Sequence, residues 1–185
     1  MAAGAIANAG PADQWHVLIE PKFMRYEVAW PIAGSDETVL VPARLVKGEI
    51  VPLRLKEVFS HFGPQRKIAT DAPEEASRIF AKLVPNIIRD ENGVIQYAVL
   101  ESKSPLTASA VLAPEFPEKF AKTLGPDLLV AIPSRQLVFV FPKQSPACEQ
   151  LAETVIVHYE TSPSPVSLEL FELRGGKLIA IGRYR

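Results

Sequence analysis

Two strongly apolar runs, separated by a short polar break, constrain the fold more than any other part of this 185-residue sequence. They form the segment Asp127–Pro142, DLLVAIPSRQLVFVFP, in which the break is Pro133–Gln136. Odd and even positions are apolar in both runs, so each run presents an apolar surface to either side. Strands of this kind are typical of the centre of a sheet that is covered on both faces. We therefore predict a central pair of strands, buried on both sides.

The rest of the chain is divided by prolines and glycines into short strands and a few amphipathic helices. Helical spacing of apolar residues predicts helices over Asp71–Val84, Glu115–Leu124 and, after Pro146, as far as Thr161. In the first helix, Asp71 is expected to act as the N-cap, because Glu74 follows at the capping-box spacing. Strands are predicted at 15–20, 25–32, 38–46, 49–55, 94–101, 166–173 and 178–184.

This order of elements predicts an α+β fold with an antiparallel sheet and about three amphipathic helices packed mainly on one face. The strands mostly come in adjacent pairs, and the strand at 178–184 is expected to lie near the central pair. Pro42 and Pro52 indicate that the strands carrying them lie at an edge or start late.

Length and composition predict a single domain. We expect residues 1–14 to form a flexible leader and residues 15–185 to form one α+β domain. The chain has 20 basic and 21 acidic residues, a net charge of −1, which argues against nucleic-acid binding. No apolar run is long enough for a membrane span, so we expect a soluble, cytoplasmic protein. An exported form that lacks its signal remains open.

The C-terminal half resembles a known family. The segments DLLVAIPSRQLVFVF and SPVSLELFELRGGKLIAIGRYR, with the helix between them, are similar to the bacterial YtpQ-like proteins, and RIFAKLVPNIIRDENG resembles the helix-Leu-Pro segment of that family. The similarity is best over residues 76–185. It implies an intracellular bacterial α+β domain without an assigned reaction, and it offers no catalytic residues to transfer.

The residues that carry chemistry in other proteins are sparse here. The sequence has no nucleophile elbow, P-loop or dinucleotide fingerprint, and its three histidines are isolated from one another. We therefore expect no catalytic residue, no metal site and no cofactor. Cys148, the single cysteine, falls on the apolar stripe of its helix, which favours a buried structural thiol over a nucleophile.

A modest candidate for a binding site remains at the break between the central strands. Arg135, beside Ser134 on a tight turn, has the geometry to hold a carboxylate or phosphate with two hydrogen bonds. Asp127, just before the first strand, is the third candidate. Polar residues are also what any hairpin turn requires, and that interpretation is favoured.

Two functions from different classes follow from these observations. The favoured hypothesis is a non-enzymatic binding or protein-interaction module that meets a protein partner, or a second copy, through edge strands of its N-terminal region. The alternative is a hydrolase-type enzyme with an unrecognised carboxylate and arginine site. A convergent group of acidic side chains in a cleft would favour the second hypothesis.

Overall fold

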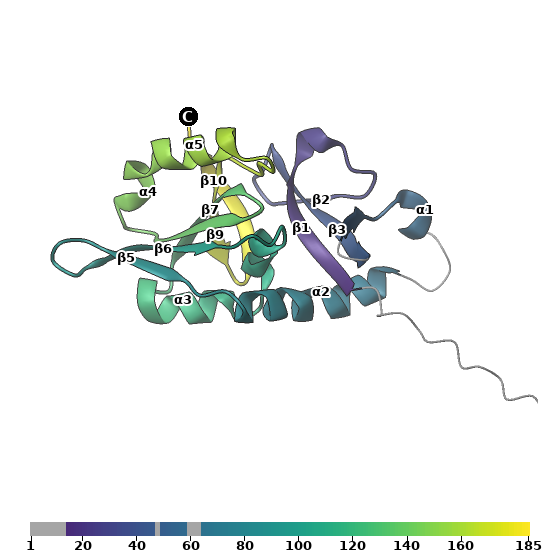
Figure 1. The fold of residues 1–185 in the computed structure, drawn as a ribbon, viewed down its shortest axis with the longest axis horizontal. Helices are drawn as coiled ribbons and strands as arrows, with labels where there is room; N and C mark the ends of the chain where they lie inside the picture. The colour runs from purple at the N-terminus through teal and green to yellow at the C-terminus, as the bar shows by residue number, and fades with distance from the viewer. Residues whose placement is uncertain (1–13, 47–48, 59–63) are drawn as a thin grey trace, which may run out of the picture.

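The chain folds into two antiparallel sheets that share one long helix. The computed structural model describes residues 14–46, 49–58 and 64–185. The N-terminal sheet contains four strands, in which β3 pairs with β1 on one side and with β2 and β4 on the other. The C-terminal sheet has six strands in the order β10-β9-β7-β8-β6-β5 (Figure 1). The strands are β1 Gln14–Pro21, β2 Trp30–Pro31, β3 Thr38–Val46, β4 Glu49–Pro52, β5 Asn86–Arg89, β6 Ile95–Glu101, β7 Leu128–Ser134, β8 Leu137–Pro142, β9 Glu169–Arg174 and β10 Lys177–Arg183.

Helices cover both faces of the C-terminal sheet. They are η1 Lys22–Met24, α1 Leu55–Val58, α2 Pro64–Ala81, η2 Thr107–Leu112, α3 Phe116–Leu124, α4 Ala147–Gln150 and α5 Ala152–Thr161. In Figure 1, α4 and α5 lie above this sheet, and α3 and the end of α2 lie below it. The α+β class with antiparallel strands is confirmed. The expectation that helices lie mainly on one face is corrected, because both faces of the central strands are apolar and each must be covered.

The predicted central pair is confirmed as β7 and β8, the third and fourth strands of six. Leu128, Val130 and Ile132 face a cluster that includes Phe116 and Phe120 of α3. The alternate positions, Leu129 and Ala131 of β7 with Phe139 and Phe141 of β8, face a second cluster with Cys148 and Val155. The strand expected near this pair, β10, pairs with β9, and β9 in turn pairs with β7.

The helix α2 begins earlier than the sequence pattern indicated. It starts at Pro64 rather than at Asp71, so Asp71 lies inside the helix and is not its N-cap. The apolar stripe continues towards the N-terminus through Ile68 and Ala72, which pack in a cluster with Val17 of β1. This packing favours the longer helix, and proline is well tolerated at the first helical position. The third predicted helix is divided at Leu151 into α4 and α5.

Pro42 lies in the central strand of the N-terminal sheet, which contradicts its expected edge position. Its carbonyl accepts a hydrogen bond from the N–H of Leu53, on the side that faces β4. In an antiparallel strand the N–H and C=O of one residue point the same way. The missing N–H of Pro42 would therefore point towards Leu53, just past the end of β4 at Pro52. The hydrogen bond that proline cannot make thus lies outside the paired residues of β4. Pro52, in contrast, does end an edge strand, β4.

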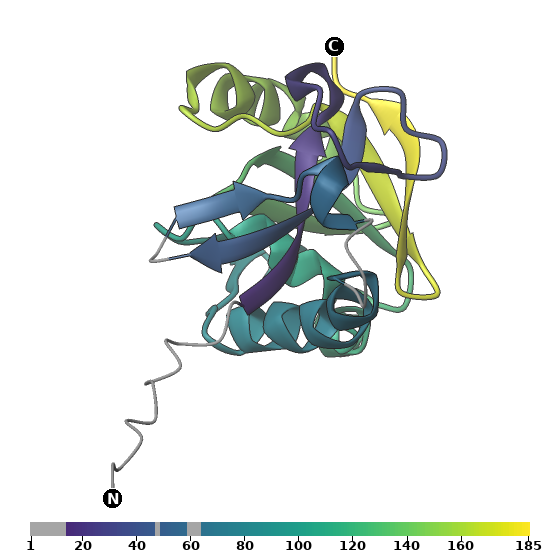
Figure 2. The ribbon, with the colours of Figure 1, turned by 90° about the vertical axis from the view of Figure 1, so that its right-hand side faces the viewer.

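The two sheets are joined by α2 and by a short backbone link. Along its length α2 passes from β1 to the core of the C-terminal sheet, where Ala76 and Phe80 are buried. Figure 2 shows the strands of the N-terminal sheet in front, with the turns of α2 below them. At the end of β2, the carbonyl of Ala33 accepts a hydrogen bond of 2.8 Å from the N–H of Ala180 in β10. Within the described ranges, no helix is both long and apolar enough to cross a bilayer. The expected leader lies outside the described residues apart from Gln14, which begins β1.

Candidate functional site

The structure does not bring the three predicted site residues together. Asp127 precedes β7, whereas Ser134 ends it and Arg135 lies in the following turn. A strand rises about 3.3 Å per residue, so β7, which lies between Asp127 and Arg135, separates them by up to roughly 26 Å. Ser134 is buried and forms an isolated bridge with Pro165. Asp127 is exposed, and its carbonyl accepts the N–H of Lys143.

Arg135 is held by a carboxylate of the N-terminal sheet. Its Nε donates to Oε1 of Glu20 at 2.7 Å, and its Nη2 donates to Oε2 at 2.9 Å. The hydroxyl of Tyr26 donates to the same Oε2 at 2.9 Å. Glu20 is only 2% exposed, so this ion pair is largely removed from solvent. The backbone N–H of Arg135 donates to the carbonyl of Ser164, which fixes the turn.

These contacts determine the electrostatics of the cluster formed by Glu20, Tyr26 and Arg135. Hydrogen bonding to Glu20 raises the pKa of the Arg135 guanidinium, so it stays charged. Burial, with the neighbouring Glu20 charge, raises the pKa of Tyr26 to about 12 and keeps the phenol neutral. Glu20 thus occupies the two-bond geometry that an external carboxylate or phosphate would need. The cluster joins the two sheets, and Arg135 is engaged within the chain.

A second buried carboxylate links the sheets in the same way. Oε2 of Glu169 in β9 accepts hydrogen bonds of 2.6 Å from the hydroxyls of Ser35 and Thr38, and Oε1 accepts the N–H of Asp36 at 2.9 Å. Burial alone would raise the pKa of Glu169, but these hydrogen bonds outweigh it and the pKa lies below its ordinary value. The carboxylate is therefore ionised, and it anchors the segment that leads into β3.

The remaining reactive groups are also engaged in packing. Cys148 is buried, with its Sγ 3.3 Å from the hydroxyl of Tyr184, and burial raises the pKa of its thiol. The predicted burial of this thiol is confirmed. Among the residues that the structure describes, no group of three or more His, Cys, Asp or Glu side chains is placed to hold a metal ion.

A pocket with a volume of about 440 Å³ lies between the N-terminal sheet and α2. The residues that line it, among those that the structure describes, are all apolar: Val17, Trp30, Leu40, Ile68, Ala69, Ala72, Pro73 and Leu112. This volume falls within the range of roughly 300–1,000 Å³ that is usual for small-molecule and side-chain sites. The hollow, called the apolar pocket below, is suited to an apolar group.

The alternation of side chains along the strands determines which residues of the N-terminal sheet line the apolar pocket. Trp30 of β2 is opposite Leu40 of β3, and Leu40 is opposite Ile19 of β1, so the three share one face. Val17 lies two residues from Ile19 and faces the same way. Across the pocket, Pro73 interrupts the hydrogen bonding of α2, because it has no N–H to donate to the carbonyl of Ala69.

Exposed apolar side chains are concentrated around this end of the molecule. Trp30, which lines the apolar pocket, is 37% exposed. Among the described residues, four of the eight exposed large hydrophobic side chains lie between residues 23 and 55: Phe23, Met24, Trp30 and Leu55. In the C-terminal sheet, by contrast, β7 and β8 are buried on both faces. The N-terminal sheet and η1 therefore carry apolar surface that the chain itself leaves partly uncovered.

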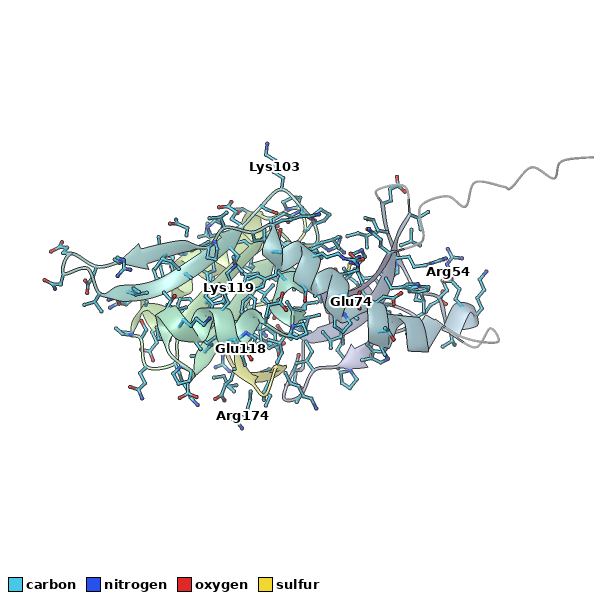
Figure 3. All side chains as sticks on the ribbon, turned by 90° about the horizontal axis from the view of Figure 1, so that it is seen from below. Arg54, Glu74, Lys103, Glu118, Lys119 and Arg174 are labelled. Atoms are coloured by element: carbon cyan, nitrogen blue, oxygen red, sulfur yellow. The ribbon has the colours of Figure 1, made fainter. Side chains whose placement is uncertain are left out.

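Charged residues of both signs are mixed on the helical face of the molecule. Seen from below in Figure 3, Glu118 and Lys119 lie together on α3, and Glu74 lies further along the same face on α2. Lys119 also places its ammonium 4.5 Å from the centre of the Phe80 ring, so part of its side chain packs on the core. The labelled residues form no single-sign patch on this face.

Sequence reasoning missed the apolar pocket and the partner of Arg135. Both depend on contacts between distant segments, since Glu20 and Arg135 are 115 residues apart. One signal was present: Glu20 ends the apolar run WHVLIE, and a charge at a position that belongs to a buried face requires a partner. For the pocket, the signal was Trp30 next to Pro31, a large aromatic residue in a short exposed strand.

Comparisons with known proteins add no relative. No protein-family model, no curated protein and no solved structure matches the chain. The resemblance to the YtpQ-like proteins therefore stays a prediction, and the arguments that follow rest on this chain alone.

Proposed function

We propose that the protein is a non-enzymatic binding module, and that its apolar pocket receives an apolar side chain of a protein partner. The observation that carries this proposal is a pocket of about 440 Å³ whose described lining residues are all apolar, bordered by the partly exposed Trp30. This described lining offers apolar contact and contributes no acid, base or nucleophile for a reaction.

A protein partner fits the surroundings better than a small molecule does. A small ligand would bury only the pocket, whereas Phe23, Met24 and Leu55 lie outside its lining and are about half exposed or more. Aromatic and methionine side chains are enriched at protein interfaces, where they fill pockets of the partner. The N-terminal region, which the sequence already favoured for contacts, thus combines a recess with projecting side chains.

The alternative hypothesis of a hydrolase has less support. The arginine of that hypothesis, Arg135, already donates two hydrogen bonds to the carboxylate of Glu20. The carboxylate of Glu169 likewise accepts hydrogen bonds from hydroxyl groups of its own chain. Groups held in this way are poorly placed to bind or activate a substrate.

A pair of matched variants tests the proposal. Ala69 is exposed on α2 and lines the apolar pocket, so Ala69→Trp fills the pocket from the surface. Ala81 is exposed at the end of the same helix and does not line the pocket, so Ala81→Trp is the control. Both variants are expected to fold as the wild type does, which circular dichroism and thermal melting will verify.

Two readouts are informative. In an NMR titration, 1-hexanol is expected to shift the Trp30 indole signal saturably in the wild type and in Ala81→Trp, but not in Ala69→Trp. In pull-downs from the native host, a protein captured by the wild type and Ala81→Trp should be lost with Ala69→Trp. The proposal is overturned if hexanol does not bind, if capture is the same for both variants, or if no partner is captured at all.

A further inference from the structure

A second pocket lies where the N-terminal sheet meets α5 and β10. It has a volume of about 380 Å³, which is within the range that is usual for small-molecule sites. Its walls come from segments far apart in the sequence: η1, the turn before β3, Tyr159 of α5 and Arg183 at the end of β10. None of its described lining residues also lines the apolar pocket. It is therefore a separate site, with a lining of different chemistry.

Charged side chains of both signs line this second pocket, which is called the charged pocket below. They are Lys22, Asp36, Glu37 and Arg183. Glu37 and Arg183 form an ion pair and neutralise each other. Lys22 and Asp36 are exposed, and among the described residues neither side chain has a partner. The charged pocket thus offers one ammonium and one carboxylate that the described part of the chain does not pair.

The backbone brings these two unpaired charges close together. The N–H of Lys22 donates to the carbonyl of Glu37 at 2.7 Å, so Lys22 lies beside the segment that contains Asp36. The N–H of Asp36 in turn donates at 2.9 Å to Oε1 of Glu169, the buried carboxylate of β9. The two charged side chains therefore start from adjacent backbone segments, and one of these segments is fixed to the C-terminal sheet.

Aromatic and apolar side chains complete the lining. Phe23 is 62% exposed at the edge of the charged pocket, whereas Val166 is buried beneath it. Tyr159 is half-buried, and its hydroxyl has no hydrogen-bond partner among the described residues. A ligand with an apolar or aromatic side chain would remove part of the exposed Phe23 surface from water, which is favourable.

We propose that the charged pocket binds a free amino acid with an apolar or aromatic side chain. Lys22 holds its carboxylate and Asp36 holds its ammonium group, while its side chain packs against Phe23. A simple anion or cation would leave one of the two protein charges unpaired, so the pocket favours a ligand that carries both. An α-amino acid carries them on one carbon, which matches charges that start from adjacent backbone segments. This proposal does not depend on the function of the apolar pocket.

An NMR titration with three related compounds tests this assignment in slightly acidic buffer. L-phenylalanine carries both charges, N-acetyl-L-phenylalanine lacks the ammonium, and L-phenylalanine amide lacks the carboxylate. L-phenylalanine is expected to shift the backbone signals of Lys22 and Asp36 saturably. Each of the other two should bind roughly five- to tenfold more weakly, because one charged contact is lost. They also represent the ends of a peptide chain, so the comparison distinguishes a free amino acid from a chain terminus.

Substitution of each charged residue should remove the matching selectivity. Lys22→Met is expected to bind L-phenylalanine as weakly as its amide, because the carboxylate no longer has a partner. Asp36→Asn is expected to bind L-phenylalanine as weakly as the N-acetyl compound. Both side chains are exposed, so both variants should fold as the wild type does. Lys103→Met, an exposed change outside the charged pocket, is the matched control and should leave all three affinities unaltered.

The outcomes separate this proposal from the one for the apolar pocket. Stronger binding of L-phenylalanine than of both analogues, with loss of the matching selectivity in each variant, supports the charged pocket as an amino-acid site. The proposal is overturned if L-phenylalanine does not bind or binds no better than its analogues. Equal binding to the wild type, Lys22→Met and Asp36→Asn also overturns it, because such binding uses another surface. The response of Trp30 to hexanol tests the apolar pocket independently of these results.

Discussion

Removing the guanidinium of Arg135 tests whether the two sheets are locked together by its pair with Glu20. Arg135→Met keeps most of the side-chain length and deletes the charge. Glu20, 2% exposed, then loses both hydrogen bonds from the guanidinium and retains only the one from Tyr26. We expect a large loss of stability, because an ionised carboxylate remains buried without its counter-charge.

The size of the expected loss of stability follows from how deeply Glu20 and Arg135 are buried. Removing one member of a buried ion pair costs about 3–5 kcal/mol. The Arg135 side chain is 25% exposed, so water can partly solvate the orphaned carboxylate, and the lower end, about 3 kcal/mol, is expected. In a chain of this size each kcal/mol lowers the melting temperature by about 2–4 °C, which gives a decrease of roughly 6–12 °C.

Urea denaturation of a double-mutant cycle measures this effect. Arg135→Met combined with Glu20→Gln should recover most of the loss, because no buried charge is left unpaired. Arg183→Met is the control, since Arg183 also joins the sheets, through Glu37, but both side chains are nearly half exposed and the expected cost is below about 1 kcal/mol. If Arg135→Met lowers the free energy of unfolding by less than about 1 kcal/mol, the reasoning is refuted, because a loss of that size is expected for a solvent-exposed ion pair.

Two further predictions concern a buried histidine and a crowded glycine. Burial lowers the pKa of His16, against an opposing effect of Glu75, and neither ring nitrogen has a hydrogen-bond partner among the described residues. The unfolded chain binds a proton near pH 6.5 and the folded chain resists it, so the free energy of unfolding should fall as pH decreases below 6.5. His16→Leu should flatten this slope down to about pH 5 in urea titrations, and an unchanged slope would contradict the assignment. Gly34→Ala should destabilise the fold by about 2 kcal/mol or more, because its Cβ would lie 2.5 Å from the Ala180 carbonyl at a φ of +73°. Gly93→Ala, with a φ of +80° but open space, should cost only about 1 kcal/mol, and equal costs in thermal melts would count against the crowding argument.

The parts of the fold that were predictable from sequence are those that local pattern determines. In β7 and β8 both faces are apolar over consecutive residues, and this allows few structures other than a buried strand pair. The helix α3 was located within one residue, because Phe116, Phe120 and Leu124 share a stripe and Gly125 follows. The start of α2 was missed because Asp71 and Pro73 resemble the beginning of a helix. Packing of Ile68 on the N-terminal sheet outweighed that local signal.

The candidate site was less predictable, because it is built from contacts between distant segments. Arg135 was identified as a polar residue with possible binding capacity, yet its partner lies in β1, and nothing near the turn indicates it. Pro42 illustrates the same limit. Its missing N–H points to Leu53, just past the end of β4, and the place where β4 ends beside β3 is a property of the assembled sheet.

The alternation of side chains along β1 connects the structural cluster with the proposed function. His16, Leu18 and Glu20 face one side and are all almost fully buried, and Glu20 provides the ion pair that ties this strand to the C-terminal sheet. Val17 faces the opposite side, towards the apolar pocket, and is only half-buried. One face of β1 therefore contributes the contacts that hold the two sheets together, and part of the other face lines the pocket that we propose receives a partner. A strand divided in this way can present a pocket on a rigid support, because the contacts that fix its position do not compete with the contacts that binding would use.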